Sequence, residues 1–184
     1  MEQIETARLL LRPWRMEDAE EMYEYAKDPD VGPNAGWKPH ESIQESREIL
    51  AAWLESEEQI FAITLKETGK IIGSLGIERD GLRQGVPGVR SLGYVLGKAY
   101  WGHGYMTEAA IAAITYAFES LKLELLSVTH YPFNERSKRV IKKCGFHYEG
   151  TLRRSTRLSD GRILDHCCYS MTREEYLEKR KNYE

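Results

Sequence analysis

The segment Trp101–Ala109, which reads WGHGYMTEA, has the residue types and spacing of an anion-binding turn. It lies between an extended apolar run over 89–97 and a helical pattern that continues to about Leu121. Glycines at 102 and 104 allow tight backbone angles and close approach of a ligand. The first N–H groups of the following helix lack intrahelical partners and lie at the positive end of the helix dipole. This order of strand, glycine turn and helix predicts a pyrophosphate site.

Two nucleotide-binding motifs with similar glycines are incomplete in this chain. The dinucleotide fingerprint requires a third glycine where the chain has Thr107. A Walker A loop requires Gly-Lys-Ser/Thr, which the sequence does not contain. Two glycines alone are also compatible with an ordinary strand-to-helix turn, so the motif needs support from the rest of the chain.

Composition describes an ordinary globular protein of 184 residues, with 41% hydrophobic and 30% charged residues, and we expect one domain over 1–184. A net charge of −3 gives no sign of direct nucleic-acid binding. No apolar stretch approaches the roughly 20 residues of a membrane span, and the N-terminus lacks a signal-peptide core. Three cysteines without a Cys-x-x-Cys pair predict neither a disulfide framework nor a metal site. These features are typical of a cytoplasmic protein with no membrane partner.

Hydrophobic periodicity and turn residues predict an alternation of strands and helices. The expected strands cover 6–12, 60–65, 70–78, 89–97, 125–131, 146–157 and 162–171, and the expected helices cover 17–27, 41–55, 105–121 and 134–144, with a charged helix closing the chain and a Gly/Pro loop over 31–40. This order predicts an α+β fold in which helices flank a mixed, mostly antiparallel sheet. Its one right-handed β-α-β crossover contains the glycine turn.

Three segments in order carry a resemblance that spans nearly the whole chain. They are Thr6-x-Arg8-Leu9-x-Leu11-Arg12-Pro13, then Gly93-Tyr94 through the glycine turn to Ala109, then Asn134-x-x-Ser137-x-x-Val140-x-x-Lys143-Cys144-Gly145-Phe146. The chain resembles the GNAT acetyltransferase superfamily, and within it the branch of ribosomal-protein N-terminal alanine acetyltransferases. The resemblance implies the acyl-CoA N-acyltransferase fold and acetyl-CoA as co-substrate.

The resemblance also implies roles for individual residues. The backbone N–H groups of the turn would hold the CoA pyrophosphate; these residues are Trp101, Gly102, His103, Gly104, Tyr105, Met106 and Thr107. The pantetheine arm would pair with the strand end at Val95 and Leu96, and the Leu96 amide would donate to the oxyanion. Asn134 would cap a helix and donate its amide NH₂ to a pantetheine carbonyl. Ser137 would donate a hydrogen bond to the departing thiolate.

Other candidate residues carry weaker expectations. Trp37, in the Gly/Pro loop, is interpreted as a wall of the acceptor pocket, with a hydrophobic lid over the core as the alternative. The side chain of His103 is expected in solvent, although it is placed to meet a phosphate. His130 and His166 are expected to be packed strand histidines rather than bases.

The general base is not assigned by the motifs. Relatives of this kind often carry a glutamate at the position of Leu92 or of Thr156, and here both positions lack one. Proton transfer through a water molecule to Glu78, His130 or a backbone carbonyl is an open alternative. Deprotonating an α-amine at pH 7 costs about 1 kcal/mol, whereas a lysine costs about 4.6 kcal/mol. An enzyme without a strong base therefore favours the α-amine.

We expect an N-acetyltransferase whose acceptor is a protein N-terminal α-amine, as on a ribosomal protein. The alternatives are a small amine such as an amino acid, polyamine or antibiotic, or a module that senses acyl-CoA without catalysis. A homodimer is compatible with the apolar loop surfaces.

Overall fold

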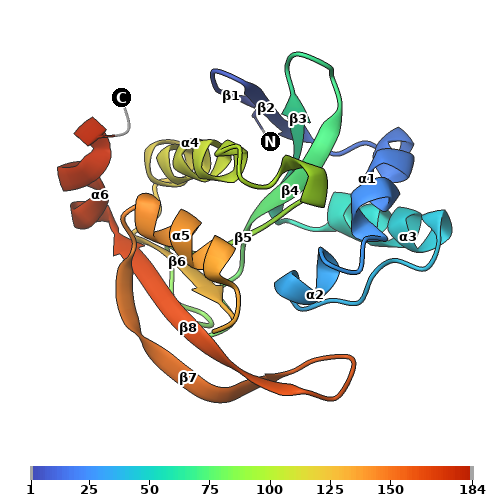
Figure 1. Cartoon of the computed structure of the whole chain (residues 1–184). Coiled ribbons are helices and arrows are strands. Elements are labelled where there is room, and N and C mark those ends of the chain that lie inside the picture. Colours follow the sequence, from blue (N-terminus) through green and yellow to red (C-terminus); the bar gives the residue numbers. More distant parts are fainter. Residues whose placement is uncertain (1, 183–184) are drawn as a thin grey trace. The chain divides into compact units, whose positions relative to one another are not determined.

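The computed structural model describes residues 2–182, and its elements are labelled in Figure 1. The strands are β1 (Ile4–Glu5), β2 (Leu9–Pro13), β3 (Gln59–Leu65), β4 (Ile71–Glu78), β5 (Val89–Leu96), β6 (Leu125–His130), β7 (His147–Arg157) and β8 (Ile163–Thr172). The α-helices are α1 (Ala19–Ala26), α2 (Gly32–Ala35), α3 (Ile43–Glu55), α4 (Tyr105–Glu119), α5 (Glu135–Lys143) and α6 (Arg173–Lys179), and the 3-10 turns are η1 (Met16–Asp18), η2 (Lys98–Tyr100) and η3 (Arg180–Asn182).

The strands form an eight-stranded sheet in the order β1-β2-β3-β4-β5-β6-β8-β7. Strand β2 pairs antiparallel with β1 and β3, and β8 pairs antiparallel with β6 and β7. Strand β5 pairs parallel with β6, and α4 is the connection between them. The prediction of a mixed, mostly antiparallel sheet with one β-α-β crossover around the glycine turn is confirmed.

Two short elements were not expected from the sequence. Strand β1 consists of two residues, too few for a periodic pattern, and it forms by pairing with β2. Helix α2 lies inside the segment 31–40 that was expected to be a loop throughout, with Pro33 in its first turn and Gly36 in the left-handed conformation at its end. These are usual start and stop residues of a helix, but one turn of helix is too short to show the period.

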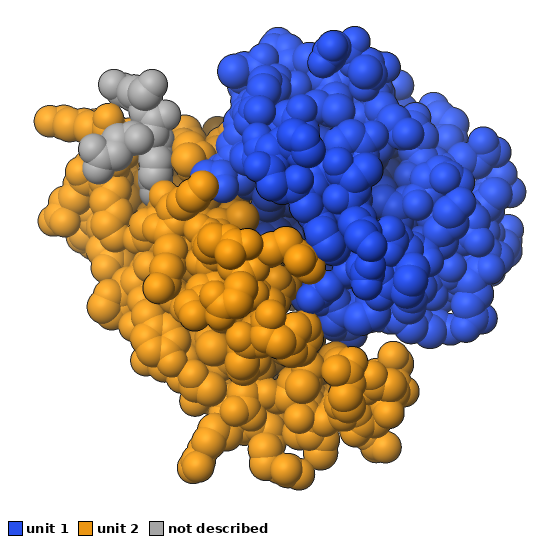
Figure 2. Space-filling view, viewed as in Figure 1, with its two compact units in different colours: residues 1–76, 94–109 blue, residues 77–93, 110–184 orange. Residues whose placement is uncertain are grey.

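The chain divides into two compact units, coloured separately in Figure 2. Unit 1 contains the chain up to Gly76 together with Tyr94–Ala109. Its core is formed by side chains from α1, α3, strands β3 and β4 and two connecting segments: Trp14, Ala19, Met22, Tyr25, Ala26, Val31, Leu50, Ile60, Ala62 and Ile71. Ser42 caps α3 by accepting a hydrogen bond from the Glu45 N–H at 3.1 Å, which fixes where that helix begins.

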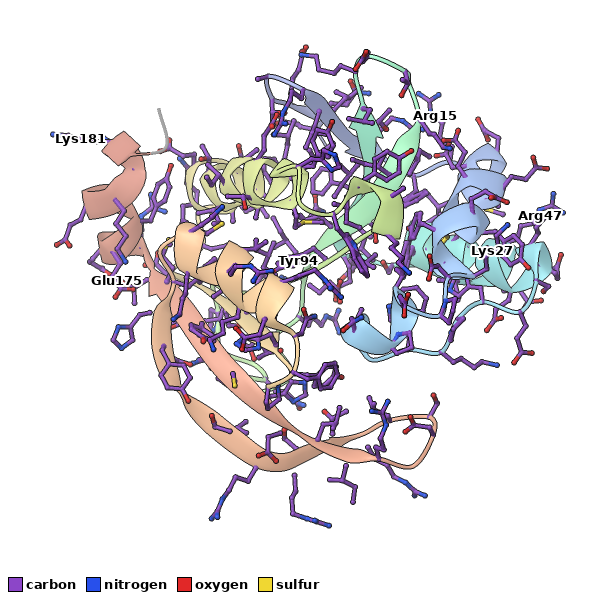
Figure 3. All side chains as sticks on the ribbon, in the orientation of Figure 1. Arg15, Lys27, Arg47, Tyr94, Glu175 and Lys181 are labelled. Carbon is purple, nitrogen blue, oxygen red and sulfur yellow. The ribbon has the colours of Figure 1, made fainter. Side chains whose placement is uncertain are left out.

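Unit 2 contains Ile77–Gly93 and the chain from Ala110 onward. Helix α6 begins with a capping box, in which the side chains of Thr172 and Glu175 accept hydrogen bonds from each other's backbone N–H groups. Glu175 is labelled in Figure 3. This helix is anchored by Tyr176, whose ring stacks on Phe118 with centroids 4.8 Å apart. Within residues 2–182 no helix is both long and apolar enough to cross a membrane.

Candidate functional site

The glycine turn connects the end of β5 to the start of α4 within unit 1. Gly102 and Gly104 have φ angles of 82° and 80°, in the left-handed region that favours glycine. The Glu108 N–H donates to the Gly104 carbonyl at 3.1 Å. The N–H groups of Tyr105, Met106 and Thr107 therefore belong to the turn that an α-helix leaves without internal partners. Residues 102 to 104 are exposed, so this helix terminus has the form of an anion-binding site.

Trp101, at the start of the turn, is anchored by two hydrogen bonds. Its indole Nε1 donates to the Leu96 carbonyl at 2.7 Å, and its backbone N–H donates to the Lys98 carbonyl at 3.2 Å. The ring packs against the core of unit 1 together with Val95. Because the Trp101 N–H is already engaged, the donors expected for a pyrophosphate begin at Gly102. The side chain of His103 is exposed and stacks on Tyr105, which agrees with the solvated side chain expected from the sequence.

An ion pair that the sequence did not reveal ties the turn to the N-terminal segment. The Arg8 guanidinium donates from Nε to Glu108 Oε2 at 2.7 Å, and Nη2 lies 2.7 Å from the same oxygen. The other carboxylate oxygen accepts from the Arg8 N–H at 2.8 Å and from the Thr6 hydroxyl at 2.6 Å. Arg8 Nη1 also donates to the His103 carbonyl at 3.0 Å, and its guanidinium lies 4.5 Å from the centre of the Tyr105 ring.

These contacts neutralise a carboxylate in the first turn of α4. Burial alone would raise the pKa of Glu108, but hydrogen bonds from Thr6 and from the Arg8 backbone and side chain outweigh it and lower the pKa. The ionised carboxylate is favourable at the positive end of the helix but repels any anion bound there. Pairing with Arg8 removes that repulsion, so the turn presents N–H donors beside a neutral ion pair.

Replacing Arg8 with alanine is expected to weaken CoA binding about tenfold, because Glu108 then stands unpaired beside the phosphates and the turn loses its tether. The double variant Arg8→Ala/Glu108→Gln, which removes the stranded charge, is expected to recover part of the affinity. Calorimetric titration of CoA at low and high salt measures both effects. Arg162→Ala, which breaks the exposed pair with Asp160, is the matched control. Equal affinity of the Arg8 variant and the wild type would contradict this role.

The end of β5 carries the two strand residues predicted to meet pantetheine. The parallel ladder with β6 joins Val89–Leu92 to Leu125–Val128, and β5 continues beyond these pairs to Leu96. Tyr94, labelled in Figure 3, lies on this continuation. The Gly97 N–H donates to the Ile72 carbonyl at 2.8 Å, which holds the strand end against β4. Unit 1 therefore brings Val95, Leu96 and the glycine turn together.

Trp37 has one face packed against unit 1. It is partly buried on the core, and its ring lies at a tilt of 47° to His40 with centroids 5.1 Å apart. A Cβ at Gly32 would lie 2.6 Å from the ring. This packing is that of a lid over the core. Its role as a wall of the acceptor site stays a prediction.

Asn134 and Ser137 lie at the start of α5 in unit 2. The side chain of Asn134 caps the helix, because Oδ1 accepts from the Ser137 N–H at 3.1 Å, and the predicted N-cap is confirmed. Ser137 lies in the first turn of this helix. Any contact of either side chain with CoA stays a prediction.

The two positions where relatives place a base contain residues that cannot accept a proton at neutral pH. Leu92 is 4% exposed on β5. The Thr156 hydroxyl on β7 lies 3.3 Å from His166 Nδ1. Glu78, considered as a water-linked base, ends β4 in unit 2, and its carboxylate oxygen would lie 3.3 Å from a Cβ at Gly93.

Comparison with known proteins identifies the family. The model of the acetyltransferase (GNAT) domain matches residues 8–147. An uncharacterised N-acetyltransferase p20 of Bacillus licheniformis is 31% identical over 180 residues, covering 96% of this chain and 99% of its own. The [ribosomal protein uS5]-alanine N-acetyltransferase of Escherichia coli is 32% identical over 89 residues, covering 48% of this chain and 45% of its own.

Solved structures agree with the fold described above. A putative ribosomal-protein-serine acetyltransferase from Vibrio cholerae has a TM-score of 0.77 and 27% identity, and the match covers 93% of this chain and 97% of the other. A Mycobacterium smegmatis RimJ in complex with CoA-disulfide has a TM-score of 0.80 and 24% identity, with 95% and 88% covered. The resemblance to the ribosomal-protein acetyltransferase branch is confirmed by these relatives. The chain belongs to the GNAT acetyltransferase family and is an N-acetyltransferase.

Proposed function

We propose that the protein transfers the acetyl group of acetyl-CoA to a protein N-terminal α-amine. The observation that carries the proposal is the exposed glycine turn at the N-terminus of α4, where the carboxylate of Glu108 is paired with Arg8. Unpaired helix N–H groups favour an anion, and a pyrophosphate offers oxygens to several of them at once. Acetyl-CoA is the acetyl donor of this family, and its pyrophosphate matches this turn.

In this proposal the residues predicted to bind acetyl-CoA take the following roles. The N–H groups from Gly102 to Thr107 bind the pyrophosphate. The end of β5 at Val95 and Leu96 pairs with the pantetheine arm in the way a peptide adds to a sheet, and the Leu96 N–H donates to the oxyanion. The Asn134 amide donates to a pantetheine carbonyl while its oxygen caps α5. The Ser137 hydroxyl donates to the sulfur as the thiolate leaves.

The choice of an α-amine acceptor rests on energetics and on the relatives. An α-amine needs about 1 kcal/mol to become neutral at pH 7, against about 4.6 kcal/mol for lysine, so it needs less help from a base. Relatives named as ribosomal-protein acetyltransferases support a protein N-terminus on a ribosomal protein. A small-molecule amine is the second candidate acceptor, because a weakly basic amine on a small molecule likewise needs little help from a base.

Thiol release from acetyl-CoA, measured with a panel of acceptors, tests the proposal. We expect turnover with peptides that carry the N-terminal sequences of ribosomal proteins, and none with the same peptides when their N-terminus is blocked and an internal lysine is present. Turnover confined to polyamines, amino acids or aminoglycosides would select the small-molecule alternative. Tight acetyl-CoA binding with no turnover on any acceptor would identify a sensor.

A further inference from the structure

The chain has five histidines, and the structure separates them by environment. His103 and His147 are exposed, and His40 is 7% exposed beside Trp37 in unit 1. The remaining two, His130 on β6 and His166 on β8, lie in unit 2. His166 is partly exposed, whereas His130 is 5% exposed.

The hydrogen bonds of Ser155 favour one protonation state of the His166 ring. The Ser155 hydroxyl donates its single hydrogen to the Leu152 carbonyl at 3.1 Å. Its 2.9 Å contact with His166 Nδ1 is a hydrogen bond at the same time only when Nδ1 carries the proton and the hydroxyl accepts, so this arrangement favours the Nδ1-protonated ring. The Nε2 of His166 then carries a lone pair, and it has no hydrogen-bond partner within residues 2–182.

The neighbouring histidine has the opposite arrangement. His130 Nδ1 lies 2.8 Å from the Tyr131 carbonyl, which can only accept, so Nδ1–H donates there. The lone pair on His130 Nε2 accepts from the Tyr169 hydroxyl at 3.3 Å. Both nitrogens of His130 are thus occupied, and the basic nitrogen that remains available in this part of unit 2 belongs to His166.

The surroundings of His166 keep it neutral. Burial lowers the pKa of His166, and the charge that His130 can carry lowers it further. At pH 7 the ring is therefore an unprotonated base. The titratable groups beside it are His130 and Tyr131 from β6 and the turn that follows, and Asp165 and Cys167 on its own strand; on β7 its partners are the neutral hydroxyls of Ser155 and Thr156.

A short run of contacts connects His166 with the start of α5. Its ring packs on Tyr131, with centroids 4.9 Å apart. The Tyr131 carbonyl accepts from the Asn134 N–H at 2.8 Å, and Asn134 in turn accepts from the Ser137 N–H. Tyr131 thus contacts both the imidazole and the helix start at which the proposed function places the thioester sulfur.

We propose that Nε2 of His166 is the general base that takes a proton from the acceptor ammonium. This proposal rests on the proposed function and assigns the general base, which the sequence motifs leave open. Nε2 removes one proton from the ammonium, and the neutral nitrogen attacks the thioester carbonyl carbon. The new C–N bond forms and the C–S bond breaks, with its electron pair leaving on sulfur. The second amine proton ends on the thiolate to give the CoA thiol, and His166 returns its proton to solvent.

The variant His166→Gln tests the role. Its kcat/KM at pH 7 is expected to fall about 100-fold, within the usual contribution of a positioned base, while the Kd for acetyl-CoA stays unchanged. The loss is expected to shrink as the pH is raised, because the acceptor amine then arrives neutral. The kcat/KM of the wild type is expected to rise with pH as His166 and the acceptor amine each lose a proton. The kcat/KM of the variant is expected to rise only with the deprotonation of the amine. His147→Gln, an exposed histidine in the same unit, is the matched control.

Two further measurements keep the test decisive. Ser155→Ala, which removes the acceptor that fixes Nδ1–H, is expected to lower kcat/KM severalfold. Nitrogen NMR of the wild-type imidazoles is expected to show an Nδ1-protonated neutral ring for His166 at pH 7, whether or not any variant folds. An Nε2-protonated or charged ring there, or a His166→Gln enzyme with wild-type rate and pH profile, would overturn the proposal. Absence of turnover in the wild type itself would instead count against the proposed function.

Discussion

Replacing Gly102 with alanine is expected to weaken acetyl-CoA binding by about 10- to 100-fold. The φ of 82° places a Cβ in the left-handed region, which costs about 1–2 kcal/mol of stability. A Cβ at Gly102 meets no atom within 4 Å, so the free protein accommodates it. The same space is where a phosphate would approach the N–H groups, and losing one hydrogen bond to a charged group costs about 1.5–3 kcal/mol. Affinity is measured by calorimetric titration, and stability by urea unfolding.

Gly161→Ala provides the matched control for this experiment. Gly161 has a φ of 87° and also meets nothing within 4 Å, but it lies in the turn between β7 and β8. Both variants are expected to lose a similar amount of unfolding free energy, and the Gly161 variant is expected to bind acetyl-CoA like the wild type. Equal affinities for the two variants would show that the turn before α4 is not where the cofactor binds.

Replacing Gly73 with alanine is expected to destabilise the protein more than any of the other single changes described above. A Cβ at this position on β4 would lie 2.2 Å from the Val95 carbonyl oxygen and 3.0 Å from the Leu96 Cα. Both are backbone atoms of β5, so the two strands must separate to make room. Overpacking costs 1–3 kcal/mol and sometimes more, and here we expect about 3 kcal/mol, or roughly 10 °C in Tm.

The same change is expected to reduce activity in the fraction that remains folded, because it moves the Leu96 amide that is proposed to meet the oxyanion. Gly81→Ala is the control: a Cβ at Gly81 meets nothing within 4 Å and its backbone is not left-handed. Its unfolding free energy is expected to stay within about 0.5 kcal/mol of the wild type. A Gly73 variant as stable and active as the Gly81 variant would contradict the close approach of β4 and β5.

Local signals explain why most elements could be predicted from the sequence. The cap at Asn134 and the glycine just past the end of α5 mark that helix within ten residues, and Asp160-Gly161 marks the hairpin between β7 and β8. The apolar face of α4 repeats with the helical period, so its place after the glycine turn was also clear.

Contacts between distant positions could not be predicted in the same way. Thr6 and Arg8 lie in one motif and Glu108 in another, and no spacing rule connects residues 100 positions apart. The protonation state of the His166 ring depends on whether the Ser155 hydroxyl donates to the Leu152 carbonyl. That hydrogen bond depends on the rotamer of Ser155, which lies at an irregular stretch of β7. The structure agrees with the expected packed strand histidine, since the ring of His166 packs on Tyr131 and contacts Ser155, and its role as a base stays a proposal.

The split of unit 1 into two stretches of chain has a consequence for its synthesis. Residues up to Gly76 leave the ribosome well before Tyr94–Ala109, which complete the same unit. Until then Arg8 cannot pair with Glu108. The core side chains of α1 and α3 also lack the cover that Val95 and Trp101 provide in the folded unit. The nascent N-terminal half therefore passes through an interval with exposed apolar surface, when chaperones have most to bind. A ribosome stalled between Gly76 and Tyr94 would present an unfinished unit rather than a folded one.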